Sequence, residues 1–245
     1  MTMEFRFWRY EYLPDGSRPA ESRAAEILPG LWYVGGYNYC CYLLLTDAGP
    51  VMVDAGVAEE SQLYSEGIRR AGSDPADLVA IIHTHNHADH IGATPQLVAL
   101  SGARTMIGEA DVLELTEGVA VDRVLRDGDE IEFGGTRLRF IHTPGHTRGC
   151  GMYLTAFAGA RVCFVGDAAG PFIFEEVRWD GDAEAFRASA QRMKQVEADL
   201  YLAGHPHQTL EVSPSGDPKL TGEQWHRYID GRVAKMESTI AGQRR

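Results

Sequence analysis

The sequence lacks any long hydrophobic run, since no apolar stretch approaches the roughly 18 residues that a membrane-spanning helix needs. Residues 1–22, MTMEFRFWRYEYLPDGSRPAES, mix charged and aromatic side chains, with no apolar segment followed by a small-residue cleavage site. This stretch is therefore not typical of a signal peptide. We expect a cytoplasmic protein without a membrane partner, unless a leader was removed before this sequence begins.

Cysteine is scarce, and its four copies do not form a metal-binding or disulfide pattern. Cys40 and Cys41 are adjacent, whereas Cys150 and Cys163 are isolated, which is not the spacing of a zinc ribbon. A chain of 245 residues does not need disulfides to be stable. We expect reduced, mostly buried thiols, and no spacing pairs one of them with a histidine as a nucleophile.

Basic residues are also fewer than acidic residues. Lys and Arg together number 23 against 35 Asp and Glu, which gives a formal net charge of −12. Nucleic-acid binding generally depends on clustered Lys and Arg side chains that replace counterions. We therefore expect a small-molecule substrate rather than a nucleic-acid partner, and the oligomeric state stays open.

The pattern along the chain indicates two similar halves. β-rich segments occupy residues 30–56, 77–83, 103–108, 124–165 and 198–205, and helical patterns occupy 59–71, 94–100, 109–115, 183–197 and 221–241. Sheets bearing helices thus appear twice in a similar order. We predict an α/β fold, an αββα sandwich of two mixed β-sheets flanked by helices, as a single domain over residues 1–245. Its core would span about residues 26–210, followed by the helix at 221–241.

Histidines gather in residues 81–93, IIHTHNHADHIGA. Four of the nine histidines, His83, His85, His87 and His90, fall there together with Asp89, directly after a predicted buried strand. Imidazole and carboxylate groups suit zinc and related divalent metals. A loop at the carboxyl end of a strand can direct several of them at one point, so this stretch predicts a metal site.

Three further metal-capable residues also follow predicted core strands. His146 lies in HTPGHTRG, Asp167 in FVGDAAG and His205 in YLAGHPHQ. Loops held by a rigid scaffold are where binding residues concentrate. This pattern predicts one site assembled along a single edge of the sheet pair.

The chain resembles the metallo-β-lactamase fold superfamily over residues 26–210. The resemblance rests on four motifs and their order along the chain: HTHNHADH, TPGHTRG, VGDAAG and AGHPH. The resemblance implies the αββα fold and a site for two metals. It assigns one metal to His85, His87 and His146, the other to Asp89, His90 and His205, and a bridging position to Asp167. The segment VMVDAG resembles the family's early strand-turn motif, which makes Asp54 a support for the ligands rather than a ligand.

Two zinc ions are the expected cofactors, with iron or manganese at the same ligands as an alternative. Of the other histidines, we expect His83 and His142 to serve packing and His226 to lie on the surface. His207, beside His205, is a candidate for substrate contact.

The expected reaction is hydrolysis. Two metals that share a water lower its pKa, so that hydroxide is available to attack the carbonyl of a small acyl compound, an ester, thioester or lactone. Asp89 is the candidate catalytic residue, because it would orient the nucleophile and help proton transfer to the leaving group.

Two alternatives stay open at this point. Residues 121–150, and a second metal without a cysteine ligand, are similar to the third subclass of class B β-lactamases, whereas Asp167 in its Gly-Asp context resembles the bridging carboxylate of glyoxalase II and lactonases. The bridging carboxylate weighs more, because it changes the charge of the site. The second alternative is an iron-dependent redox or ligand-sensing member of the fold.

Aromatic residues at 172–179 would form either an apolar substrate wall or a cover for a sheet edge.

Overall fold

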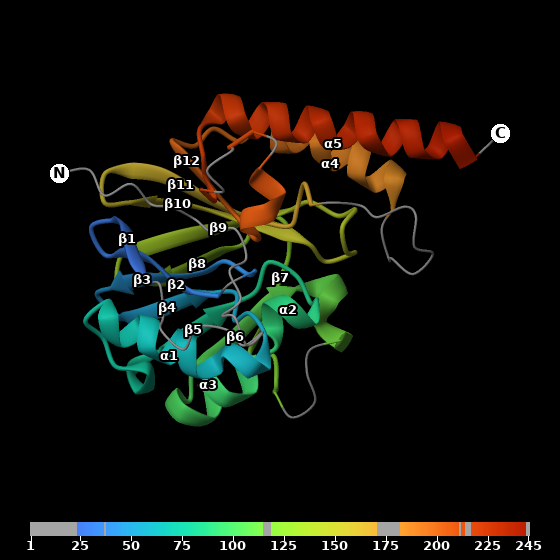
Figure 1. Ribbon diagram of the computed structural model, residues 1–245. Helices are drawn as coiled ribbons and strands as arrows, with labels where there is room; N and C mark the ends of the chain where they lie inside the picture. Colours follow the sequence, from blue (N-terminus) through green and yellow to red (C-terminus); the bar gives the residue numbers. More distant parts are fainter. Residues whose placement is uncertain are drawn as a thin grey trace, which may run out of the picture.

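The computed structural model describes residues 24–36, 38–114, 119–170, 182–210, 212–213 and 217–243. Within these ranges two β-sheets lie face to face, and helices cover the outer face of each sheet (Figure 1). The predicted α/β sandwich of the αββα type is therefore confirmed. No helix within these ranges is long and apolar enough to cross a membrane.

The first sheet has seven described strands in chain order. They are β1 (Ala25–Leu28), β2 (Leu31–Gly35), β3 (Cys41–Thr46), β4 (Gly49–Val53), β5 (Ala80–Ile82), β6 (Arg104–Gly108) and β7 (Arg123–Leu125). The pairs from β1 to β4 are antiparallel, and those from β4 to β7 are parallel. Every residue of β5 is buried, as expected for a strand in the middle of a parallel sheet.

The second sheet has six described strands in the order β13-β12-β11-β10-β9-β8. They are β8 (Glu130–Phe133), β9 (Thr136–His142), β10 (Gly151–Phe157), β11 (Ala160–Gly166), β12 (Leu200–Ala203) and β13 (Lys219–Leu220). Side chains alternate between buried and exposed in β8, where Ile131 and Phe133 face the core. Only β11 and β12 pair in parallel, so this sheet is also mixed.

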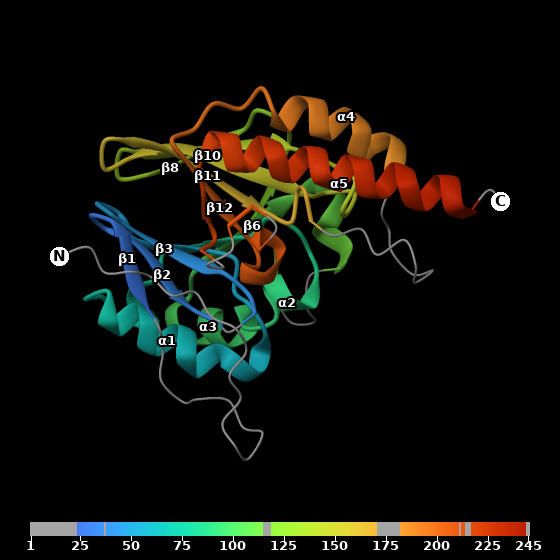
Figure 2. The same cartoon turned by 45° about the horizontal axis from the view of Figure 1, so that its top comes forward.

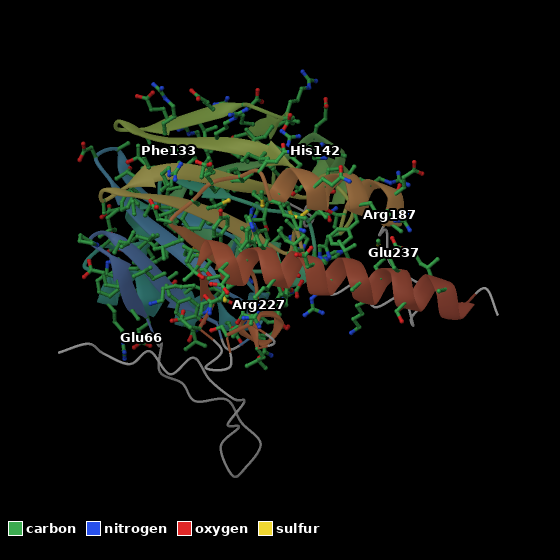
Figure 3. The ribbon with its side chains drawn as sticks, turned by 90° about the horizontal axis from the view of Figure 1, so that it is seen from above. Glu66, Phe133, His142, Arg187, Arg227 and Glu237 are labelled. Carbon is green, nitrogen blue, oxygen red and sulfur yellow. The ribbon has the colours of Figure 1, made fainter. Side chains whose placement is uncertain are left out.

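The helices form the outer layers. The α-helices are α1 (Ser61–Arg70), α2 (Ala88–Ile91), α3 (Thr94–Ser101), α4 (Ala183–Met193) and α5 (Gly222–Gln243), and the 3-10 helices are η1 (Ala58–Glu60), η2 (Pro75–Asp77), η3 (Glu109–Glu114) and η4 (Pro206–Thr209). Helices α1 and α3 cover the first sheet, and α4 and α5 lie side by side over the second (Figure 2). Arg187 of α4 and Glu237 of α5 join these two helices through hydrogen bonds of 2.5 and 3.1 Å (Figure 3).

Three apolar clusters hold the layers together. Leu44 and Phe164 belong to the cluster between the two sheets. Trp225 belongs to the cluster that joins the second sheet to α4 and α5. Ile68 and Leu97 pack the helices of the first half against the first sheet. Because each sheet buries both faces, burial of apolar surface on either side fixes its position.

The helical pattern predicted at residues 109–115 is a 3-10 helix over Glu109–Glu114. Two other predicted elements differ from the structure. Helix α4 ends at Met193 and does not continue to residue 197, because the chain turns there to enter β12. The strand near Val124, predicted to belong to the second half, is β7 of the first sheet. The backbone N–H of Thr105 donates to the Asp122 carboxylate at 2.8 Å, which attaches the start of β7 to β6.

Helix α1 packs directly on the backbone of β2. A Cβ atom built at Gly67 would lie 1.8 Å from the carbonyl oxygen of Val34, which is backbone and cannot move aside. Gly67 is therefore required for the close approach of this helix to the sheet.

We predict that Gly67→Ala lowers the free energy of unfolding by about 2 kcal/mol, because overpacking a tight contact typically destabilises a protein by about 1–3 kcal/mol. Gln62→Ala, at an exposed position of the same helix, is the control and should change it by less than about 0.5 kcal/mol. Urea denaturation followed by circular dichroism measures both. Equal stability of Gly67→Ala and the wild type would contradict the close contact.

Candidate metal centre

Four strands end at the same edge of the sandwich. In the second sheet β9, β11 and β12 run in one direction and end at His142, Gly166 and Ala203, and in the first sheet β5 ends at Ile82. The loops that leave these ends carry all the predicted ligands. In α/β sheets, ligands bind outside the carboxyl ends of the strands.

Hydrogen bonds between the sheets fix this edge. The Tyr153 hydroxyl donates to the carbonyl of His83 at 2.8 Å, and the backbone N–H of Gly151 donates to the carbonyl of Thr84 at 2.9 Å. The Tyr42 hydroxyl of the first sheet donates to the carbonyl of Ala203 in the second at 2.6 Å. The loop after β5 and the end of β12 are thus each tied to the opposite sheet.

All seven predicted ligands lie together. The structure brings them into three groups whose nitrogen and oxygen atoms lie within 4.8 Å of one another: His85, His87 and His146; His85, His90 and Asp167; and Asp89, His90 and His205. The first and third groups are the two ligand sets that the resemblance implied. The second group connects them through Asp167.

The distances within the groups are short. Nδ1 of His87 lies 3.0 Å from Nε2 of His146, and Nε2 of His90 lies 3.2 Å from Nε2 of His205. One oxygen of Asp167, Oδ2, lies 3.6 Å from His146 Nε2 and 3.3 Å from His205 Nε2. Asp167 therefore stands between the two groups, in the position predicted for a bridging carboxylate.

Backbone and side-chain acceptors set the orientation of the imidazoles. His205 Nδ1 lies 2.6 Å from the carbonyl oxygen of Asn38, and His90 Nδ1 lies 2.9 Å from the Asp54 carboxylate. Because an acceptor faces each Nδ1, this nitrogen donates a hydrogen bond and Nε2 is the ring atom that faces the cluster. Nε2 of His85 is buried in the cluster and forms no hydrogen bond with the described residues.

Asp54 performs the supporting role predicted for it. Its carboxylate accepts hydrogen bonds from the backbone N–H and the hydroxyl of Thr84, both at 2.8 Å, in addition to the contact with His90. The backbone of Asp54 has φ of 56°, in the left-handed region that non-glycine residues rarely adopt. Such strain is typical of functional sites, where surrounding contacts hold the conformation in place.

The electrostatics of the cluster favour a bound cation. Burial lowers the pKa of the His146 imidazole to about 3 and that of His85 well below its usual value. Burial also acts to lower the pKa of His90, but the Asp167 and Asp54 carboxylates outweigh it and raise that pKa to about 9. For Asp167, burial acts to raise the pKa, yet the imidazoles of His205 and His90 hold it well below its usual range. The Asp167 carboxylate therefore stays ionised and attracts positive charge.

The geometry fits divalent metal ions. With Zn–N bonds of about 2.0–2.1 Å and tetrahedral angles, two ligand nitrogens would lie roughly 3.3 Å apart. The ring nitrogens here are separated by 3.0 and 3.2 Å, and the contacts to Asp89 and Asp167 range from 3.3 to 3.6 Å. Imidazole nitrogens with carboxylate oxygens are also the donor set that zinc, iron and manganese accept.

His83, His142 and His226 lie outside these groups, as expected. Nε2 of His83 contacts the Thr94 hydroxyl at 3.2 Å in the interior. His142 contacts the carbonyl of Arg148, and His226 is exposed on α5. The side chain of His207 and the aromatic segment at 172–179 lie outside the described part of the chain, so their predicted roles stay predictions.

The cysteines behave as predicted. All four are buried and form no disulfide. Burial raises the pKa of every one of these thiols. A thiolate nucleophile is therefore disfavoured at each position.

One residue at the site had no signal in the sequence. Nε2 of Gln208, in η4, donates a hydrogen bond to Oδ2 of Asp167 at 2.7 Å, and both side chains are buried. A glutamine three residues after a ligand matches no ligand motif. Only the packing of η4 against the end of β11 reveals this contact.

A family model, the metallo-beta-lactamase superfamily, matches residues 34–205. The chain belongs to this superfamily. It is 32% identical over 197 residues to the hydroxyacylglutathione hydrolase of Acidiphilium cryptum, a match that covers 73% of this chain and 72% of that enzyme. Matches to two other hydroxyacylglutathione hydrolases span 60% and 40% of those enzymes.

Two further comparisons illustrate the range of similar proteins. An N-acyl homoserine lactonase of Bacillus sp. is 29% identical over 202 residues, which are 67% of this chain and 80% of the lactonase. The solved structure of a class B3 di-zinc metallo-β-lactamase from an Alaskan soil metagenome gives a TM-score of 0.77 at 25% identity and covers 89% of this chain and 94% of its own. The protein is thus a metallo-hydrolase of this superfamily.

We predict that His87→Ala and Asp167→Ala each lower the amount of metal bound per chain and abolish turnover, because each removes a group that faces the cluster. His226→Ala removes an exposed imidazole elsewhere and serves as the control. Elemental analysis after gel filtration gives the metal content. Wild-type metal content and activity in either site variant would refute the assignment of that residue.

Proposed function

We propose that this chain hydrolyses a small acyl compound, an ester, thioester or lactone, at a centre that binds two divalent metals. The observation that carries the proposal is the placement of the Asp167 carboxylate between two groups of three ligands. A carboxylate there resembles the bridging ligand of glyoxalase II and lactonases. A small-molecule substrate and a cytoplasmic location belong to the same proposal.

Zinc is the proposed metal at both positions. His85, His87 and His146 would hold one ion, Asp89, His90 and His205 the other, and Asp167 would contact both. Two such ions, when bound, would lower the pKa of a shared water and would polarise a substrate carbonyl. The class B3 β-lactamase of similar fold is described as a di-zinc enzyme, which supports two zinc ions here.

The solvent exposure of the ligand side chains indicates a role for Asp89. Five of the seven ligands are buried, whereas His87 is half-buried and the side chain of Asp89 is 33% exposed. Among the described residues, the ligands are therefore most exposed at these two positions, and we expect a substrate to approach from this side. Oδ2 of Asp89 lies 3.5 Å from His205 Nε2, so the carboxylate stands between solvent and the ligands. In this position Asp89 can hold the nucleophile by a hydrogen bond and pass its proton to the leaving group.

The relatives support an acyl substrate. One is named for a hydroxyacyl group carried on glutathione and another for an acylated homoserine lactone, and both substrates contain an activated carbonyl. Fold alone does not select among the reactions of a widely used scaffold. The Asp167 carboxylate, which adds negative charge between the two ligand groups, is the feature that favours this class.

A β-lactamase of the third class-B subclass is the second candidate. Its support is the likeness of fold to the class B3 enzyme and the resemblance in residues 121–150. Both features concern the scaffold, whereas Asp167 belongs to the site itself. We therefore rank this activity second.

A substrate panel tests the proposal. The zinc-loaded protein is assayed with acyl-thioesters, lactones, p-nitrophenyl esters and nitrocefin, with Asp167→Ala as the inactive control. We expect kcat/KM for the best acyl substrate to exceed that for nitrocefin by about 100-fold, equivalent to roughly 2.7 kcal/mol of activation free energy.

Two results would overturn this function. Rapid nitrocefin hydrolysis with little turnover of the other compounds would assign the protein to the β-lactamases. Purification with one iron per chain, and no hydrolysis of any compound after loading with zinc, would favour the redox or ligand-sensing alternative.

A further inference from the structure

A buried carboxylate outside the ligand set lies behind the cluster. Asp111, in η3, is only 2% exposed. Its Oδ2 accepts a hydrogen bond from the Thr147 hydroxyl at 2.7 Å, and its Oδ1 accepts one from the backbone N–H of Gly149 at 2.6 Å. The backbone N–H of Asn86 donates to the same carboxylate. Three donors from two separate loops thus meet on one side chain.

Two of these donors, Asn86 and Thr147, are direct chain neighbours of ligands. Asn86 lies between His85 and His87 in the loop after β5, and Thr147 follows His146 in the turn after β9. The two loops leave different sheets. Asp111 is therefore a connection between them, at the point where His87 Nδ1 and His146 Nε2 lie 3.0 Å apart.

The local packing is built closely around this carboxylate. A Cβ atom at Gly149 would lie 2.5 Å from Cγ of Asp111, so only glycine allows the backbone to approach it. A buried carboxylate is stabilised when several hydrogen bonds satisfy its oxygens, and such bonds are stronger than those between neutral groups. The Asp111 carboxylate is therefore held in one position by its hydrogen bonds and by the close approach of Gly149.

We propose that Asp111 is a positioning residue that sets the spacing of His85, His87 and His146 and thereby the affinity of one of the two metal positions. The proposal rests on the proposed two-metal centre and deepens it. Groups that orient metal ligands through hydrogen bonds typically change metal affinity by about 10–100-fold when removed.

The effect should be confined to one position. Asp54 contacts His90 of the other set directly, and it reaches His85 only through Thr84, whose hydroxyl lies 3.1 Å from His85 Nδ1. Asp111 contacts neighbours of the His85, His87 and His146 set. Asp54 is thus the buried carboxylate that contacts a ligand of the second set directly, whereas Asp111 accepts hydrogen bonds from the loops that carry His85, His87 and His146.

The test removes one hydrogen bond and keeps Asp111, because replacement of a buried carboxylate can prevent folding. Thr147→Val has nearly the same shape as threonine but lacks the hydroxyl that donates to Asp111. Thr147→Ser keeps the hydroxyl. Thr143→Val is the matched control, because the Thr143 hydroxyl is buried in the same turn and forms no hydrogen bond with the described residues.

Each protein is stripped of metal and titrated with Zn²⁺ in competition with a chromophoric chelator, which gives two dissociation constants for the wild type. Thermal melting confirms that each variant is folded. We expect Thr147→Val to weaken one of the two constants by about 10-fold and to leave the other within about twofold. Thr147→Ser and Thr143→Val should match the wild type.

The outcomes separate this inference from the proposed function. If the wild type binds two zinc ions and Thr147→Val binds both equally well, the role of Asp111 is wrong and the two-metal centre stands. Equal loss in Thr147→Val and Thr147→Ser would assign the effect to packing and also overturn the inference. If the wild type itself fails to bind two ions, the proposed centre is wrong.

Discussion

The metal centre depends on the hydrogen bonds that hold the two sheets together at one edge. The ligands come from loops of both sheets, so a small change in the distance between the sheets would separate them. The hydroxyls of Tyr42 and Tyr153 each cross from one sheet to a carbonyl at a strand end of the other. Because these bonds are buried, they are not weakened by competition with water, and they fix the positions from which the loops start.

The cluster brings together polar side chains whose hydration in water is favourable. Buried imidazoles and a buried carboxylate lie within a few ångströms of one another, and burial of polar groups without full pairing is unfavourable. Within the described residues, neither Nε2 of His85 nor Oδ1 of Asp167 forms a hydrogen bond. Such unsatisfied atoms in a well-packed interior are typical of a site that is completed by a ligand, here a cation. The arrangement therefore serves binding more than it serves the stability of the fold.

Residues that bind no metal themselves account for much of the geometry. Asp54 orients His90, the carbonyl of Asn38 orients His205, and Gln208 holds Asp167. For His90 and His205, the bonded nitrogen is Nδ1, and Nε2 faces the cluster. Gln208 donates to Oδ2 of Asp167, the same oxygen that faces His146 and His205, and so it limits the rotation of this carboxylate. Proteins generally tune metal sites through such surrounding contacts.

The sequence by itself indicated the fold class and the region of the metal site, because hydrophobic periodicity and a dense run of histidines are local features, and the resemblance carried by the motifs assigned the seven candidate ligands. It also identified Asp54 and the buried cysteines. Sequence could not find Asp111 or Gln208, since an isolated Asp or Gln carries no local signal, and it placed β7 with the wrong sheet and extended α4 beyond Met193. Only the tertiary structure brings Asp111 against Thr147, 36 residues away in the chain, because contacts of that range follow from how the sheets pack.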